Sequence, residues 1–168
     1  AMDSGEVDLE EETKPQVEVV AYNLTSQNIM LRDQFYALEE VYDKFATSLN
    51  RSLSTSLQRA IEAEFVSTEM MKYSEFIGTF SSPTNFTIYS MDPLIGSAML
   101  VIEPTLVYSL IDCMFGGDGK PTQRMREFTL IEQRMMRKFA LEVLNVLQEA
   151  WKIIDPINVV LKKNEIKP

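Results

Sequence analysis

Residues 104–119 read PTLVYSLIDCMFGGDG, and this stretch places three of the chain's six glycines within four positions. Apolar residues precede the glycines at spacings of three and four, which is the periodicity of an amphipathic helix. Pro104 suits the first turn of such a helix, where a missing backbone N–H removes no hydrogen bond. We therefore predict a helix from Pro104 to Phe115 that ends at the glycines.

Three interpretations of the loop Gly116-Gly117-Asp118-Gly119 are open. Phosphate binding is disfavoured, because phosphate binds at helix N-termini, whereas this loop follows a C-terminus and carries the anionic Asp118. A helix stop with no further role is the second interpretation, since glycine tolerates positive φ angles and lets the last turn close. The third is a surface without side chains that another protein's backbone approaches closely. In each case we expect Gly116, Gly117 and Gly119 to adopt backbone angles closed to other residues.

The composition predicts one folded domain with a substantial core. The chain has 168 residues, of which 45% are hydrophobic, and its longest apolar stretches are too short to cross a bilayer. Its net charge of −9 argues against a nucleic-acid partner, which requires a basic surface. The acidic N-terminus also lacks the basic start of a signal peptide.

The chain contains no histidine and a single cysteine, Cys113. The absence of histidine removes Ser-His and Cys-His catalysis and histidine-containing zinc sites. One cysteine excludes an internal disulfide and fits a reducing compartment. We interpret Cys113 as a small buried hydrophobic residue, and we expect no cofactor and no metal site, since the acidic residues lack calcium-loop spacing.

The chain divides into an N-terminal tail and one domain. Residues 1–20 are rich in Asp and Glu without a sustained apolar pattern, which predicts a disordered acidic linker. Ala1-Met2 resembles a cloning remnant. Residues 21–168 are then the folded domain.

Two long helices are predicted on either side of the glycine loop. An apolar stripe from Phe35 to Leu57 indicates a helix over about 28–60. Thr129 and Glu132 resemble a capping box, after which apolar residues predict a heavily buried helix ending near Trp151. Its predicted buried stripe consists of Leu130, Ile131, Met135, Met136, Phe139, Ala140, Leu141, Val143, Leu144, Val146 and Leu147.

Three segments have the pattern of strands. Residues 85–91 alternate and are rich in β-branched and aromatic residues, and residues 157–161 follow the turn at Asp155-Pro156. Residues 98–102 are apolar on both faces, which predicts a central strand covered by helices on both sides. A single helical turn is expected within 74–80. The order of elements predicts an α/β fold with long helices packed on a central sheet.

Several short motifs occur in the order found in one known family. These are LNRSLS at 49–54, YSEFI at 73–77 with SPT at 82–84, the GGDG loop at 116–119, REFTLIEQR at 126–134, and Ala150-Trp151. In this respect residues 22–168 resemble the middle domain of the FliM family of flagellar motor switch proteins. The ordered set is specific, although each motif alone is weak.

The resemblance implies a layered α/β/α, pseudo-twofold domain related to the CheC and CheX phosphatases. It implies a structural and signalling component of the flagellar C-ring, cytoplasmic and peripheral at the inner membrane face of the basal body, that couples the chemotaxis signal to the direction of rotation. The family binds FliG through its GGxG loop, which maps onto Gly116, Gly117 and Gly119, with Asp118 in the variable position and Phe115 beside it. Neighbouring FliM subunits are further partners, and FliN and phosphorylated CheY bind through regions expected to lie outside this chain.

The alternative function is a phosphatase of phosphorylated CheY. The related phosphatases use a Glu and an Asn one helical turn apart, a spacing shared by Glu142 and Asn145. However, Lys138 occupies a position where those enzymes usually have Asp or Ser, and the corresponding part of the first helix lacks a Glu-x-x-Asn. We therefore predict a solvated pair on the helix face, and a binding module instead of an enzyme.

Overall fold

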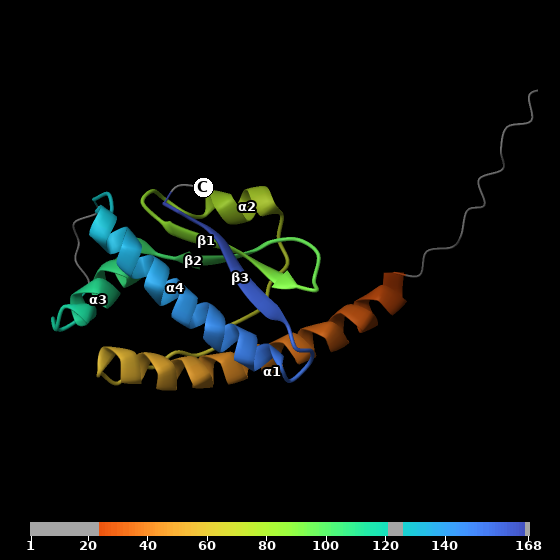
Figure 1. The fold of residues 1–168 in the computed structure, drawn as a ribbon. Helices are drawn as coiled ribbons and strands as arrows, with labels where there is room; N and C mark the ends of the chain where they lie inside the picture. The colour runs from red at the N-terminus through yellow and green to blue at the C-terminus, as the bar shows by residue number, and fades with distance from the viewer. Residues whose placement is uncertain (1–23, 121–125, 167–168) are drawn as a thin grey trace, which may run out of the picture.

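The computed structural model describes residues 24–120 and 126–166. The predicted acidic linker at residues 1–20 and most of the polar loop after the glycines lie outside the described residues. The described residues form seven elements, which Figure 1 labels. They are α1 (Leu24–Leu57), α2 (Tyr73–Gly78), β1 (Asn85–Asp92), β2 (Ala98–Ile102), α3 (Pro104–Met114), α4 (Leu130–Trp151) and β3 (Asn158–Glu165).

The predicted helices are confirmed, although the first spans Leu24–Leu57 instead of about 28–60, because the chain turns at Gln58, which has a positive φ. Pro104 lies at the start of α3, and Phe115 is the residue that caps its C-terminus. Helix α4 starts at a complete capping box, in which the Thr129 hydroxyl accepts from the Glu132 N–H and the Glu132 carboxylate accepts from the Thr129 N–H. Such a box satisfies two N–H groups that have no partner within the helix.

The sheet is antiparallel and has the order β2-β1-β3 among the described residues. The prediction that residues 98–102 form the central strand is therefore wrong. β1 is central and almost wholly buried, whereas β2 lies at one edge and is half-buried. Ala98, Leu100 and Ile102 of β2 pack into the hydrophobic clusters with the helices, whereas Met99 and Val101 on the other face are only half-buried.

The layers are two long helices, the sheet, and the short helix α2 (Figure 1). On one face, Tyr89 of β1 packs with Leu144 and Leu147 of α4, and Tyr42 and Phe45 of α1 join this cluster. On the other face, Phe80 follows α2 and packs edge-on against Phe86, with 5.7 Å between the ring centroids. This arrangement confirms the layered α/β/α prediction.

A second cluster fills the space between the C-terminal half of α1, helix α3 and the first half of α4. It is built around Leu53, Val107, Met136 and Phe139, all buried. Cys113 packs against it while remaining half-buried. This cluster fixes the position of α3 and therefore the place where the glycine loop leaves the protein body.

The first turn of α4 departs from the predicted buried stripe. Leu130 and Ile131 are largely exposed and Leu141 is partly so, whereas Met136, Phe139 and Val143 are buried as expected. The apolar stripe is wider than the contact that α1, α3 and the sheet make with α4. Within the described residues, no helix is both long and apolar enough to cross a membrane.

Candidate functional site

The glycine loop is built on a hydrogen-bonded cap at the C-terminus of α3. The N–H of Gly116 donates to the carbonyl of Cys113 at 3.0 Å, and the N–H of Gly117 donates to the carbonyl of Asp112 at 2.8 Å. These two bonds form a Schellman motif, which requires a left-handed residue at its turn. Gly116 supplies it with φ +84°, and Gly119 also has a positive φ of +71°.

Gly117 needs to be glycine for a different reason from the one predicted. Its φ is not in the left-handed region, so that part of the prediction is wrong. A Cβ atom at Gly117 would lie 2.2 Å from a carboxylate oxygen of Asp112. At Gly119 a Cβ atom would lie 2.6 Å from the Cys113 sulfur, in addition to the positive φ. The loop is therefore folded closely over the last turn of α3.

The Asp112 side chain organises this close packing. Its Oδ2 accepts a hydrogen bond of 2.8 Å from the N–H of Gly119, while its own carbonyl accepts from Gly117. A carboxylate near a helix C-terminus is normally unfavourable, because that end carries partial negative charge. Here the loop N–H compensates by donating to it. An aspartate in the last turn before a glycine-rich loop is the sequence signal that could have identified this residue.

Arg59 contacts the loop from a distant part of the chain. Its guanidinium donates a hydrogen bond to the carbonyl of Gly117, across 58 residues of sequence. Arg59 is the second residue after the end of α1. Gln58 before it has φ +52°, and the N–H of Arg59 donates to the carbonyl of Ser54. No local sequence pattern indicates this contact, because it depends on how α1 and α3 pack together.

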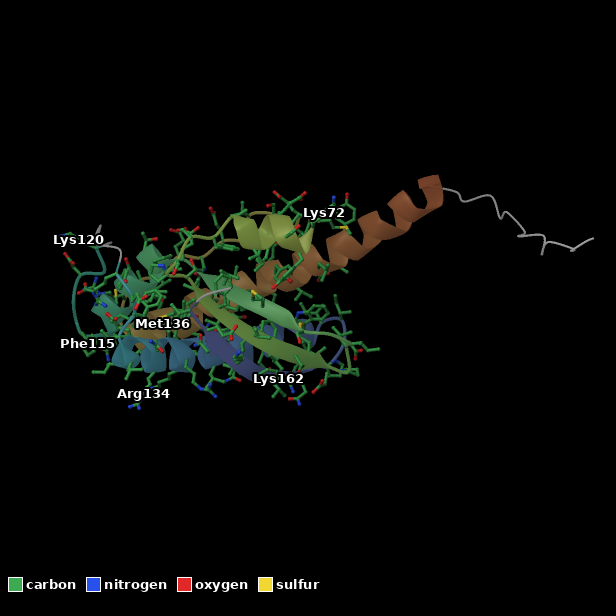
Figure 2. All side chains as sticks on the ribbon, turned by 90° about the horizontal axis from the view of Figure 1, so that it is seen from above. Lys72, Phe115, Lys120, Arg134, Met136 and Lys162 are labelled. Carbon is green, nitrogen blue, oxygen red and sulfur yellow. The ribbon has the colours of Figure 1, made fainter. Side chains whose placement is uncertain are left out.

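The predicted binding residues come together on an exposed end of the molecule. Phe115, beside Gly116, is 70% exposed although its side chain is large and apolar. Figure 2 shows Phe115 and Lys120 at the same end of the molecule, away from Lys72 and Lys162. Asp118 and Lys120 form an exposed ion pair of 2.5 Å, and this hydrogen bond from Lys120 lowers the pKa of Asp118, with a smaller contribution from Arg59.

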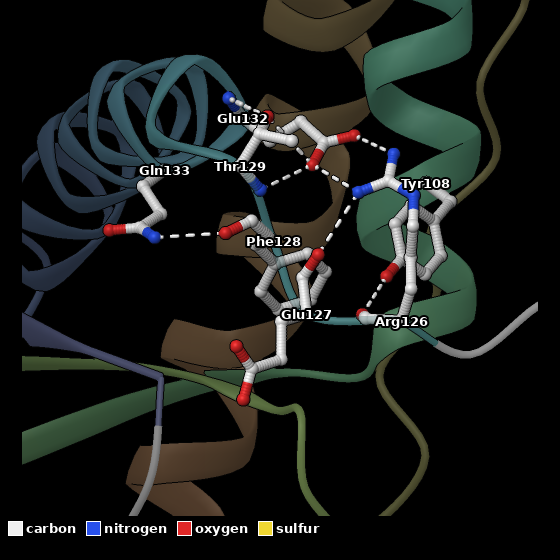
Figure 3. Close-up of polar contacts among 7 residues, drawn as sticks. All are labelled: Tyr108, Arg126, Glu127, Phe128, Thr129, Glu132 and Gln133. Carbon is white, nitrogen blue, oxygen red and sulfur yellow. Dashed lines mark hydrogen bonds and ion pairs between the residues drawn. The ribbon is translucent and has the colours of Figure 1, made fainter.

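A shallow depression of about 380 Å³ connects the loop to the start of α4. Its far side is formed by a network around Arg126 (Figure 3). Arg126 donates to both carboxylate oxygens of Glu132, at 2.8 and 2.5 Å, and lies 5.3 Å from the ring centroid of Tyr108. The lining residues are Tyr108, Ile111, Asp112, Phe115, Asp118, Lys120, Arg126 and Glu132.

The depression presents no group of residues suited to hold a metal ion. Within residues 24–120 and 126–166, no three Asp, Glu or Cys side chains are arranged to share a cation. The Glu132 side chain is only 10% exposed, and its carboxylate is occupied by Arg126 and Thr129. The surface offers glycines without side chains, of which Gly116 is exposed and Gly117 and Gly119 are half-buried, together with the exposed Phe115 and a few charges, which suits contact with another protein.

Glu142 and Asn145 lie elsewhere, and the structure corrects the prediction of a solvated pair. Both carboxylate oxygens of Glu142 accept hydrogen bonds across the helix interface, from Ser52 at 2.7 Å and from Ser56 at 3.1 Å. Asn145 is exposed. Glu142 therefore connects α4 to α1.

Comparison with known proteins gives a consistent result. The family model described as "Flagellar motor switch protein FliM" matches residues 31–168. FliM of Pseudomonas aeruginosa is 32% identical over 168 residues, which covers 99% of this chain and 52% of the relative. FliM of Escherichia coli is 32% identical over 148 residues, covering 87% and 44%. The chain spans about half the length of the curated relatives it matches.

Solved structures show the same fold. A FliG-FliM complex from H. pylori matches with a TM-score of 0.76 and 28% identity, covering 81% of this chain and 75% of that one. The FliM middle domain from H. pylori matches with a TM-score of 0.73 and 26% identity, covering 82% and 74%. FliY from Thermotoga maritima, at a TM-score of 0.69 and 20% identity, shares the fold.

Proposed function

We propose, from the premise that this chain belongs to the FliM family of flagellar motor switch proteins, that it binds FliG through the loop at the end of α3. The contact residues are Phe115, Gly116, Gly117, Asp118 and Gly119. In this role the chain is a structural and signalling component of the rotor, which couples the chemotaxis signal to the direction of motor rotation.

One observation carries the proposal. Asp112 holds Gly117 and Gly119 against the end of α3, and these half-buried glycines together with the exposed Gly116 form a surface without side chains beside the large, exposed Phe115. An exposed aromatic residue next to accessible main chain is a common anchor for a protein partner. The matched H. pylori structure is a complex of FliG with FliM, which makes FliG the partner to test.

The same membership supports the wider assembly that we propose. Neighbouring FliM subunits would contact this domain in the cytoplasmic C-ring, peripheral to the inner membrane face of the basal body. FliN and phosphorylated CheY would act through other parts of the full protein.

We also propose that this domain has no enzymatic role. The phosphatase alternative needs Glu142 and Asn145 to face a phosphorylated partner together. The Glu142 carboxylate is instead held by two hydroxyl groups of α1, which supports a role in packing. The absence of histidine from the chain removes the commonest general base and agrees with this proposal.

The substitution Gly117→Arg tests the FliG proposal. Its Cβ would displace the Asp112 carboxylate and so break the bond from Gly119, which disturbs the loop but leaves the hydrophobic core intact, so we expect the domain to remain folded. The added side chain would then obstruct the approach of a partner. We expect FliG affinity in a calorimetric titration to fall about 100-fold or more, while the circular dichroism melt keeps its cooperative transition.

Gly78→Arg is the matched control. Gly78 ends α2, lacks the positive φ of the loop glycines, and has open space around its Cβ position. We expect this variant to fold and to bind FliG as the wild type does. If Gly117→Arg lowers the melting temperature but the folded protein retains its affinity, the loop is a helix stop and lies outside the interface.

A further inference from the structure

The C-terminal ends of two helices, α1 and α3, meet at the glycine loop. Each end has a left-handed residue, Gln58 after α1 and Gly116 after α3, and each has a backbone hydrogen bond that closes the last turn. The chain reversal at Gln58 directs Arg59 away from the axis of α1. The Arg59 guanidinium then reaches the carbonyl of Gly117.

The contact from Arg59 adds a restraint to a loop that is already tied to α3 at three points. Gly116 and Gly117 are tied to α3 by their N–H groups, and Gly119 is tied by its bond to Asp112. Among the described residues, Arg59 supplies the hydrogen bond to the Gly117 carbonyl. Because glycine has more conformational freedom than any other residue, one extra restraint there removes many alternative loop shapes.

The charges around the loop favour the same placement of Arg59. The helix end presents carbonyl groups with partial negative charge, and Asp112 and Asp118 both lie on the loop side. A guanidinium is always charged and presents several N–H donors in a fixed plane, so it suits a carbonyl in this environment. The Coulombic effect of Arg59 on the pKa of Asp118 agrees with this proximity.

We infer that Arg59 is a positioning residue for the partner-binding loop: it holds the Gly117 carbonyl and so presents Phe115 and the loop backbone in one conformation before the partner arrives. This inference rests on the proposed function. A loop that is ordered in advance loses less conformational entropy on binding, so the restraint strengthens association without Arg59 touching the partner.

The test uses Arg59→Met, which keeps an unbranched aliphatic side chain and removes every N–H hydrogen-bond donor of the guanidinium. We expect FliG affinity to fall about three- to tenfold, in line with the loss of one typical hydrogen bond at an exposed site. Arg59→Lys retains a charged donor and should recover part of the affinity. Arg51→Met changes an exposed arginine within α1, eight residues before Arg59, and should leave affinity unchanged.

A second measurement needs no partner. Amide hydrogen exchange of Gly117 and Gly119, followed by nuclear magnetic resonance, should be several times faster in Arg59→Met than in the wild type or Arg51→Met. The melting temperature should change by no more than about 2 °C, because Arg59 is an exposed surface residue. A purely structural role would lower the melting temperature without selectively affecting these two amides.

The outcomes separate the inference from the proposed function. If wild-type protein does not bind FliG, the proposed function fails, and the exchange rates still decide whether Arg59 orders the loop. If affinity falls while the exchange of Gly117 and Gly119 stays unchanged, Arg59 contacts the partner directly and the positioning role is overturned. Unchanged affinity together with unchanged exchange also overturns it.

Discussion

Asn50 shows how one side chain secures a segment that has no regular structure. Its amide donates to the carbonyl of Ala63 at 3.1 Å and accepts from the N–H of Ala63 at 2.5 Å. Ser54, one turn later, accepts from the N–H of Ile61 at 3.0 Å. These bonds hold the extended segment that follows α1 along the helix, and they explain two positions of the LNRSLS motif in structural terms.

We predict that Asn50→Ala lowers the free energy of unfolding by about 1–3 kcal/mol, because the backbone groups of Ala63 lose their partners in a half-buried site. Urea unfolding followed by fluorescence of Trp151 measures the effect. Asn145→Ala is the control, since Asn145 is exposed on α4, and it should change stability by less than about 0.5 kcal/mol. Equal losses in both variants would contradict the role assigned to Asn50.

At the loop, single residues could be predicted only in part. The sequence indicated that the glycines end a helix, because helix periodicity and glycine preference are local properties. It did not reveal that Gly117 is constrained by the Asp112 carboxylate, or that Arg59 contacts the loop. Both facts depend on side-chain directions and on the packing of separate helices.

Among the elements, helices were predicted more reliably than strand order. The bounds of α3 and α4 follow from Pro104, the Thr129–Glu132 capping box and the glycines, all of which act locally. The place of β2 at the sheet edge was missed, because an apolar strand can be shielded by helices without having a strand on each side. Strand order is set by pairings between distant residues.

The end of α1 provides a prediction about helix capping. Gln58 has φ +52°, a conformation that disfavours any residue with a Cβ atom. We expect Gln58→Gly to raise the free energy of unfolding by about 0.5–1 kcal/mol. Glycine relieves the backbone strain of the folded state, and this gain is partly offset because glycine also increases the conformational entropy of the unfolded chain.

Chemical denaturation of Gln58→Gly beside Gln58→Ala tests this explanation. Alanine keeps the Cβ atom and should bring no gain in stability. If both variants change stability equally, the effect comes from losing the glutamine side chain, and the backbone conformation does not explain it.

For the whole molecule, the network around Glu132 connects three parts of the structure. Arg126 joins the segment before α4 to the Glu132 carboxylate, and its guanidinium lies over the Tyr108 ring of α3 (Figure 3). The Tyr108 hydroxyl in turn donates to the Arg126 carbonyl. The network therefore attaches the start of α4 to α3 beside the proposed binding loop.

This network should make stability depend on pH in the acid range. The hydrogen bonds from Arg126, with smaller contributions from Thr129, lower the pKa of Glu132 from 4.5 to about 2. A carboxyl group whose pKa is lower in the folded state stabilises the fold above its unfolded pKa. That stabilisation is lost as the pH falls from about 4.5 toward 2.

We therefore expect Glu132→Gln to be less stable than the wild type at pH 7, by on the order of 2 kcal/mol, because Arg126 is half-exposed and solvent screens part of the interaction. The gap between the two proteins should shrink steadily between pH 4.5 and pH 2.5, where the wild-type carboxyl becomes protonated in the unfolded state. Urea unfolding at several pH values measures this gap in stability, and comparing the two proteins cancels the titration of the other carboxylates.

Glu149→Gln is the control: it removes an exposed ion pair with Lys152 and should differ from the wild type in stability by only a small, nearly constant amount across this pH range. A gap for Glu132→Gln that stays constant down to pH 2.5 would mean that the charge of Glu132 contributes nothing to folding.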